Sequence, residues 1–90
     1  MEFEWDEEKA TANLAKHGVS FDEAKAVFDD PLNVDFYDPD HSVDEHRYII
    51  LGESQQRRLL IVSYTERDDI VRLISAREVT RHERETYEEG

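Results

Sequence analysis

The chain has 90 residues, no cysteine and a formal net charge of −12 at pH 7. This length suits one domain, and we predict a single domain over residues 1–90. The absence of cysteine excludes a disulfide framework and a thiolate metal site. No stretch approaches the roughly 18 apolar residues of a membrane span, and the acidic N-terminus is unlike a signal peptide, so we expect a cytoplasmic protein.

The charge is divided unevenly along the chain. Residues 1–46 hold fourteen acidic residues and three lysines, whereas residues 47–90 hold all eight arginines and nine acidic residues. An acidic protein repels polyanions, yet the planar guanidinium of arginine can bind two phosphate oxygens at once. The arginines of the second half therefore either form a binding site or merely offset the acidic residues.

The N-terminal segment predicts a short apolar element followed by a helix. Phe3 and Trp5 alternate with acidic residues, which indicates a short edge strand or an apolar lead-in. Asp6 is suited to cap a helix, and Gly18 is suited to end it in the left-handed conformation. We therefore expect the first helix between these two residues.

A second helix is predicted after Gly18. Ser20 and Glu23 have the spacing of a capping box, in which each side chain bonds the backbone N–H of the other residue. Apolar residues at helical spacing follow, and the Asp-Asp-Pro sequence at 29–31 ends the pattern.

Strand patterns occupy most of the second half. They cover residues 32–37, 47–51, 58–65 and 70–76, and a polar segment over 80–88 predicts a last helix with Tyr87 as its apolar anchor. The order predicts an α+β fold. It comprises two N-terminal helices, an antiparallel sheet of three to four strands with one face covered by those helices, and a C-terminal helix.

Strand alternation and element ends single out a few cations. Strict alternation places Arg72 with Ile74 and Ala76 on one face of the last strand, and Arg77 on the other. Arg67 and Arg77 lie at strand ends, where a short helical cover would leave them reachable. Taken alone, each arginine is as well explained as a solvated charge paired with a neighbouring carboxylate.

Lys16 and His17 end the first predicted helix and could join such a site. Histidine titrates near neutral pH and can move a proton to or from a ribose hydroxyl. The alternative explanation is that His17 is favoured at a helix C-terminus by the helix dipole.

The segment 38–46 contains possible metal ligands. His41 and His46 accompany Asp38, Asp40 and Asp44, but no pair among them has a spacing that fixes a coordination geometry. We therefore predict neither a metal nor a cofactor.

Several segments together resemble one family, and the resemblance runs from Trp5 to Tyr87. The stretches that carry it are Trp5-Asp6-Glu7, residues 13–21 (NLAKHGVSF), Glu23-Ala24, residues 47–52 (RYIILG), residues 63–67 (SYTER) and residues 72–77 (RLISAR). In this order and at this separation they resemble the BrnT family of type II toxin–antitoxin modules.

This resemblance implies a RelE-like ribonuclease fold and metal-independent cleavage of RNA, which halts translation. It also implies a BrnA-type antitoxin partner, usually a ribbon-helix-helix protein, and a hetero-oligomer formed with it.

The resemblance also implies roles for individual residues. His17, Glu66, Arg67 and Arg77 would be catalytic, with His17 or Glu66 as the base, while Lys16, Arg47 and Arg72 would bind substrate. The net charge of −12 is unusual for a protein that binds RNA. A second hypothesis is therefore a non-catalytic module that pairs with a DNA-binding antitoxin to regulate transcription.

Overall fold

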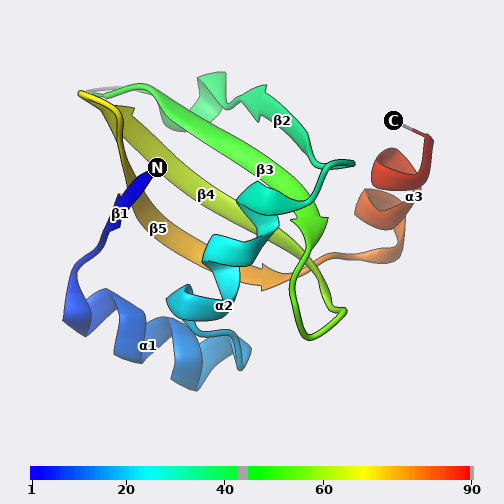
Figure 1. Ribbon diagram of the computed structural model, residues 1–90, viewed down its shortest axis with the longest axis horizontal. Helices are drawn as coiled ribbons and strands as arrows, with labels where there is room; N and C mark the ends of the chain where they lie inside the picture. Colours follow the sequence, from blue (N-terminus) through cyan, green and yellow to red (C-terminus); the bar gives the residue numbers. More distant parts are fainter. Residues whose placement is uncertain (43–44, 90) are drawn as a thin grey trace.

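The computed structural model describes residues 1–42 and 45–89, and it is an α+β structure (Figure 1). The helices are α1 (Glu7–His17), α2 (Phe21–Lys25) and α3 (Arg81–Glu89), with 3-10 turns η1 (Ala26–Asp29) and η2 (Pro39–His41). The strands are β1 (Glu2–Glu4), β2 (Val34–Tyr37), β3 (Arg47–Glu53), β4 (Leu59–Arg67) and β5 (Ile70–Glu78). The predicted fold class is confirmed.

The sheet has five strands in the order β1-β5-β4-β3-β2. The strands from β2 to β5 form the antiparallel part that we predicted, but β1 joins the edge of β5 in parallel, with Phe3 opposite Val71. The four antiparallel strands agree with the predicted three to four, whereas the fifth, parallel strand was not predicted as part of the sheet. The alternation of Phe3 and Trp5 did indicate a short edge strand, but so short a segment does not identify a partner far away in the sequence.

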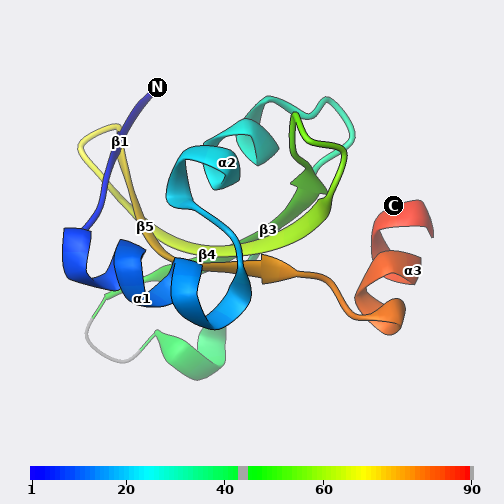
Figure 2. The same ribbon diagram turned by 90° about the horizontal axis from the view of Figure 1, so that it is seen from below.

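One face of the sheet is covered and the other carries only a short turn. In Figure 2, α2 lies on one side of the curved sheet and the turn of residues 39–41 lies on the opposite side. The buried core on the helix side comprises Val19, Phe21, Ala24, Val27, Ile50, Leu60, Val62, Tyr64, Val71, Leu73 and Ala76. We call the opposite side the open face.

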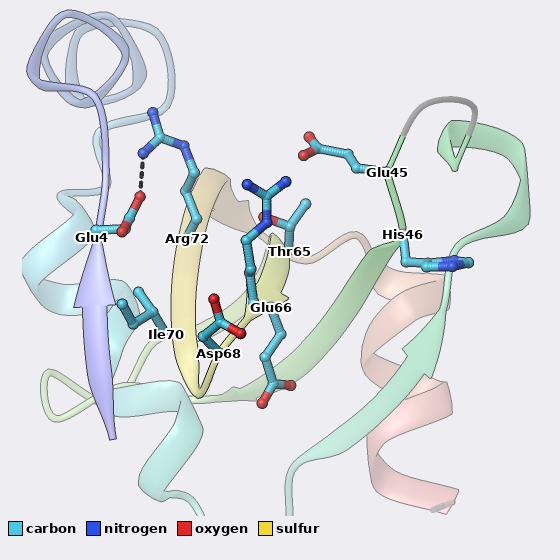
Figure 3. A pocket seen from close by; sticks show the side chains of 9 residues that line it. Glu4, Glu45, His46, Thr65, Glu66, Asp68, Ile70 and Arg72 are labelled. Carbon is cyan, nitrogen blue, oxygen red and sulfur yellow. Dashed lines mark hydrogen bonds and ion pairs between the residues drawn. The ribbon is translucent and has the colours of Figure 1, made fainter.

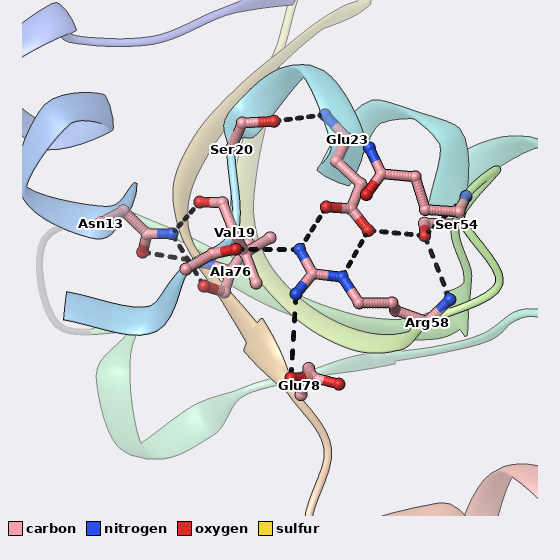
Figure 4. Close-up of polar contacts among 10 residues, drawn as sticks. Asn13, Val19, Ser20, Glu23, Ser54, Arg58, Ala76 and Glu78 are labelled. Atoms are coloured by element: carbon pink, nitrogen blue, oxygen red, sulfur yellow. Dashed lines mark hydrogen bonds and ion pairs between the residues drawn. The ribbon is translucent and has the colours of Figure 1, made fainter. Parts of the chain in front are cut away.

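Helix α1 is capped as its sequence predicts and is joined to β5 by one buried side chain. Asp6 Oδ1 accepts from the backbone N–H of Glu8 at 2.8 Å, and Gly18 ends the helix at φ +69°. The Asn13 amide donates to Val19 O and Ala76 O, and it accepts from Ala76 N (Figure 4). Since β1 pairs only with residues 70–72, Asn13 takes the place of a strand at this part of the β5 edge.

Glu23 forms a buried ion pair instead of the predicted reciprocal cap. Ser20 Oγ accepts from Glu23 N at 3.0 Å, but the Glu23 carboxylate accepts from Arg58 and from Ser54 Oγ (Figure 4). Arg58 also donates to Gly18 O at 2.9 Å, so one guanidinium joins α1, α2 and the β3–β4 turn. The Arg58 hydrogen bond lowers the pKa of Glu23 and outweighs the effect of burial, which acts to raise it.

An irregularity in β5 changes which of its residues share a face. Ser63 pairs with Ser75, but Tyr64 pairs with Leu73, so Ile74 is an extra residue in β5. Arg72 and Arg77 consequently lie on the same face, whereas strict alternation predicted opposite faces. That prediction was wrong because a single bulged residue reverses the alternation beyond it.

Helix α3 is held by polar contacts and has no buried residue. Tyr87 Oη donates to Asp30 Oδ2 at 2.6 Å, so Tyr87 anchors the helix through a hydrogen bond rather than through the predicted apolar contact. Thr80 and Glu83 form a reciprocal capping box at its start. Glu83 N donates to Thr80 Oγ1 at 3.2 Å, and Thr80 N donates to Glu83 Oε1 at 2.8 Å. Within the described ranges, no helix combines the length and the apolar character that a membrane crossing requires.

Candidate functional site

Four arginines share the open face of the sheet. Arg47 pairs with Thr65, which also pairs with Arg72, and residues opposite each other in a ladder point to the same side. Arg77 pairs with Ile61, and Arg67 follows Thr65 by two residues, so both lie on this side as well. Helix α2 and the buried core lie on the other side of the sheet. The fold therefore gathers these four cations on the face opposite the core.

A groove of about 270 Å³ lies between the central strands and η2. Its lining consists of two arginines, two serines, an aspartate–histidine pair and three isoleucines: Arg47, Arg77, Ser63, Ser75, Asp38, His41, Ile49, Ile61 and Ile74. We call it the central groove. It combines groups that can bind a phosphate with a group that can move a proton.

Arg77 in this groove is not a free cation. Its Nη1 and Nη2 donate to the two carboxylate oxygens of Glu83 at 2.8 and 2.9 Å. These hydrogen bonds lower the pKa of Glu83 to about 2 and raise the pKa of Arg77. A phosphate must therefore compete with Glu83 for the end of the guanidinium.

A second groove of about 580 Å³ lies at the end of β4 and β5 (Figure 3). We call it the lateral groove, and its lining is Glu4, Glu45, His46, Thr65, Glu66, Arg67, Asp68, Ile70 and Arg72. Arg72 Nη1 lies 2.5 Å from Glu4 Oε2, so this arginine is also paired. Among the residues that the structure describes, Arg67 has no carboxylate within 4 Å. The four carboxylates of this groove make it a poor site for a polyanion.

The residues singled out from the sequence are not gathered in one place. Arg47 and Arg77 line the central groove, whereas Glu66, Arg67 and Arg72 line the lateral groove. Lys16 and His17 end α1, with Lys16 exposed and His17 half-buried, and neither lines either groove. The structure therefore offers two separate groups of arginines with different neighbours.

The described residues of the segment 38–46 do not assemble three ligands. His41 Nδ1 lies 2.8 Å from Asp38 Oδ2, and His46 Nδ1 lies 3.2 Å from Tyr37 Oη. Asp44, one of the possible ligands, lies outside the described residues. Among those that are described, no three histidine or carboxylate side chains converge as metal ligands would.

The sequence analysis did not anticipate the Asp38–His41 contact. The two residues are three apart and span Pro39, which starts the 3-10 turn η2. Residues three apart face the same side of such a turn, so the Asp-Pro-Asp-His sequence contained the signal for this contact.

The fold defines a small α+β protein with two arginine-lined grooves on the open face of its sheet. Residues 5–83 match the family described as ribonuclease toxin, BrnT, of type II toxin-antitoxin system. The chain therefore belongs to the BrnT family, which confirms the resemblance seen in the sequence. It is a BrnT-family ribonuclease toxin of a type II toxin–antitoxin system.

A solved structure shares this fold. The crystal structure of the Brucella abortus ribonuclease toxin BrnT superimposes with a TM-score of 0.66 at 23% identity, and the match covers 90% of this chain and 99% of that one. No curated protein matches the chain.

Proposed function

We propose that this chain is an endoribonuclease that cuts RNA without a metal ion and thereby inhibits translation. The observation that supports it is the common face of Arg47, Arg67, Arg72 and Arg77, which lies opposite the buried core. Phosphate contacts supply much of the affinity for RNA, and these arginines offer such contacts despite the net charge of −12. In this proposal residues 1–90 form one RelE-like toxin domain that acts in the cytoplasm.

The chemistry would follow that of metal-free ribonucleases. A base takes the proton of a ribose 2′-hydroxyl, which attacks the adjacent phosphorus atom. Arg67 and Arg77 stabilise the added negative charge, and loss of one such contact costs roughly 2.7–4 kcal/mol of transition-state stabilisation. The resemblance to BrnT toxins proposes His17 or Glu66 as the base.

Substrate contacts would come from three further cations. Arg47 and Arg72 share the open face with the proposed catalytic arginines, and Arg72 must leave Glu4 to bind a phosphate. Lys16 at the end of α1 would contact RNA outside the two grooves. Because carboxylates occupy several of these guanidiniums, RNA binding exchanges one anion for another.

The test is cleavage of a labelled RNA by the purified protein with a chelator present, at low and at molar salt. We expect cutting by the wild type and loss of cutting in Arg77→Ala by more than about tenfold. Arg84→Ala is the matched control, because Arg84 is exposed on α3 and lines neither groove. Equal cutting by Arg77→Ala and the control would contradict a catalytic role for Arg77.

We further propose a BrnA-type ribbon-helix-helix antitoxin as partner and a hetero-oligomer with it. The fourteen acidic residues of positions 1–46 suit a basic partner surface. Co-expression with the small gene next to the toxin gene, followed by co-purification at low and high salt, tests this. A complex that forms equally well at both salt concentrations would exclude the proposed charge pairing.

The net charge also supports a second candidate function. A non-catalytic module could pair with a DNA-binding antitoxin and regulate transcription without contacting RNA. The substitutions His17→Ala, Arg67→Ala and Arg77→Ala separate the two functions. A toxin would lose growth inhibition in these variants and would still bind its partner. A binding module would not inhibit growth either as the wild type or as a variant.

A further inference from the structure

His41 and Asp38 form a pre-oriented pair beside the central groove. His41 Nδ1 donates to Asp38 Oδ2 at 2.8 Å, which fixes the neutral imidazole in the tautomer whose Nε2 is a free acceptor. The Asp38 side chain is 13% exposed and the His41 side chain 66% exposed. The carboxylate is thus enclosed while the ring that it orients remains open to a ligand.

The backbone under this pair is held firmly to β3. Asp38 N donates to Arg47 O at 2.9 Å, and Ser42 Oγ donates to Asp38 O at 2.5 Å. Ser42 Oγ in turn accepts from Arg47 N at 2.9 Å. Two residues of the central groove, Asp38 and Arg47, are therefore coupled directly through main-chain hydrogen bonds.

The guanidinium of Arg47 provides an independent indication of a ligand. Its Nε is buried and has no hydrogen-bond partner among the described residues, of which Glu45 has the nearest carboxylate oxygen, 4.0 Å away. Buried N–H donors are almost always paired, so an unpaired one beside a groove points to an acceptor supplied from outside. A phosphate oxygen in the central groove is an acceptor of this kind.

We propose that the central groove is where RNA is cut, with His41 as the general base and Asp38 as its positioning residue. This assignment rests on the proposed function. His41 Nε2 takes the proton of the 2′-hydroxyl while the O2′–P bond forms and the P–O5′ bond breaks. The leaving 5′-oxygen takes a proton from water, the imidazolium returns its proton to solvent, and Arg47 and Arg77 stabilise the phosphorane.

The other histidines are less well placed for this role. His17 ends α1 and lines neither groove. His46 faces the lateral groove, but its Nδ1 contacts the phenol of Tyr37 rather than a carboxylate. Within the described part of the chain, His41 alone combines a carboxylate partner with two arginines in one groove.

The test compares single-histidine variants of the full chain on a labelled RNA oligonucleotide, both free and bound to ribosomes as messenger RNA. We expect His41→Ala to lower the cleavage rate by about 10²–10⁴-fold and added imidazole to restore part of it. His46→Ala is the matched control, because His46 does not line the central groove, and it should stay within about threefold of the wild type. His41 is mostly exposed, so the variant should remain folded, which a thermal melt checks.

Asp38→Asn tests the positioning role separately. We expect at least about a tenfold loss of rate, because the amide no longer fixes the productive tautomer. In the His41→Ala background the same change should have no further effect, whereas a merely structural aspartate would lower the rate again.

The possible failures are distinct. If the wild type cuts neither free nor ribosome-bound RNA, the proposed function fails and this assignment fails with it. If the wild type cuts and His41→Ala cuts within about threefold of it, only the assignment to His41 is overturned.

Discussion

The Arg77 guanidinium and the Glu83 carboxylate face each other end-on, joined by two hydrogen bonds of 2.8 and 2.9 Å. Glu83 also accepts from Thr80 N, so a single carboxylate caps α3 and neutralises an arginine of the central groove. Arg77 itself lies in β5 and α3 begins four residues later, at Arg81. The ion pair therefore links the orientation of α3 to the state of the groove.

Glu83→Gln should be less stable than the wild type near neutral pH and should approach it in acid. The folded pKa of Glu83 is about 2, below the ordinary value of 4.5, so the stabilisation is complete above pH 4.5 and disappears as the pH falls toward 2. Because Arg77 is partly exposed, we expect the gap in unfolding free energy to narrow by only about 1 kcal/mol between pH 6 and pH 3. Urea unfolding at several pH values measures this difference in unfolding free energy, with Glu85→Gln as the control. A difference between the wild type and Glu83→Gln that does not change with pH would contradict the prediction.

Arg58→Met should destabilise the fold strongly, because it leaves the Glu23 carboxylate buried without its partner. The Glu23 side chain is 3% exposed, and breaking a buried pair from one side costs about 3–5 kcal/mol. We expect a loss of about 2–4 kcal/mol here, since Ser54 still donates to the carboxylate.

The double variant Arg58→Met with Glu23→Gln separates charge burial from lost packing. It should recover part of the stability, because no charge then remains buried. A double variant as unstable as the sum of the two single changes would show that the pair does not act as a unit.

Asn13→Ala should lower the unfolding free energy by about 2–3 kcal/mol, because it leaves Ala76 N–H and two carbonyl groups unpaired in the interior. Lys9→Gln on the exposed side of the same helix should change it by less than about 0.5 kcal/mol. Hydrogen exchange of the Ala76 amide offers a direct check. Unchanged protection of that amide in Asn13→Ala would disprove the proposed role of Asn13 at the sheet edge.

Gly52→Ala should destabilise the fold although Gly52 lies within a regular strand. A Cβ at this position would lie 2.8 Å from Val27 Cγ1 and 3.1 Å from Val27 O, so η1 would have to move. Overpacking of this kind costs about 1–3 kcal/mol. If the clash with the Val27 side chain dominates, the double variant Gly52→Ala with Val27→Ala should be no less stable than Gly52→Ala alone. Thermal unfolding of the two single variants and the double variant tests whether the side chain or the backbone oxygen of Val27 dominates.

The local features of the fold were predictable because their causes lie within a few residues. The Asp6 cap, the Gly18 stop and the apolar runs of β3 and β4 each depend on near neighbours in the sequence. The family was recognisable because its segments keep their order and separation.

The tertiary structure alone decided which polar groups meet. Glu23 has the spacing of a capping residue, yet its carboxylate binds Arg58, 35 residues away, because packing places a guanidinium within reach. Asn13 bonds a strand 63 residues away, and no local signal marks it. The extra residue Ile74 brings Arg72 and Arg77 to one face, and η2 sets His41 beside that face. Local sequence determined the elements of this protein, whereas long-range packing, which depends on all of them at once, determined the contents of its grooves.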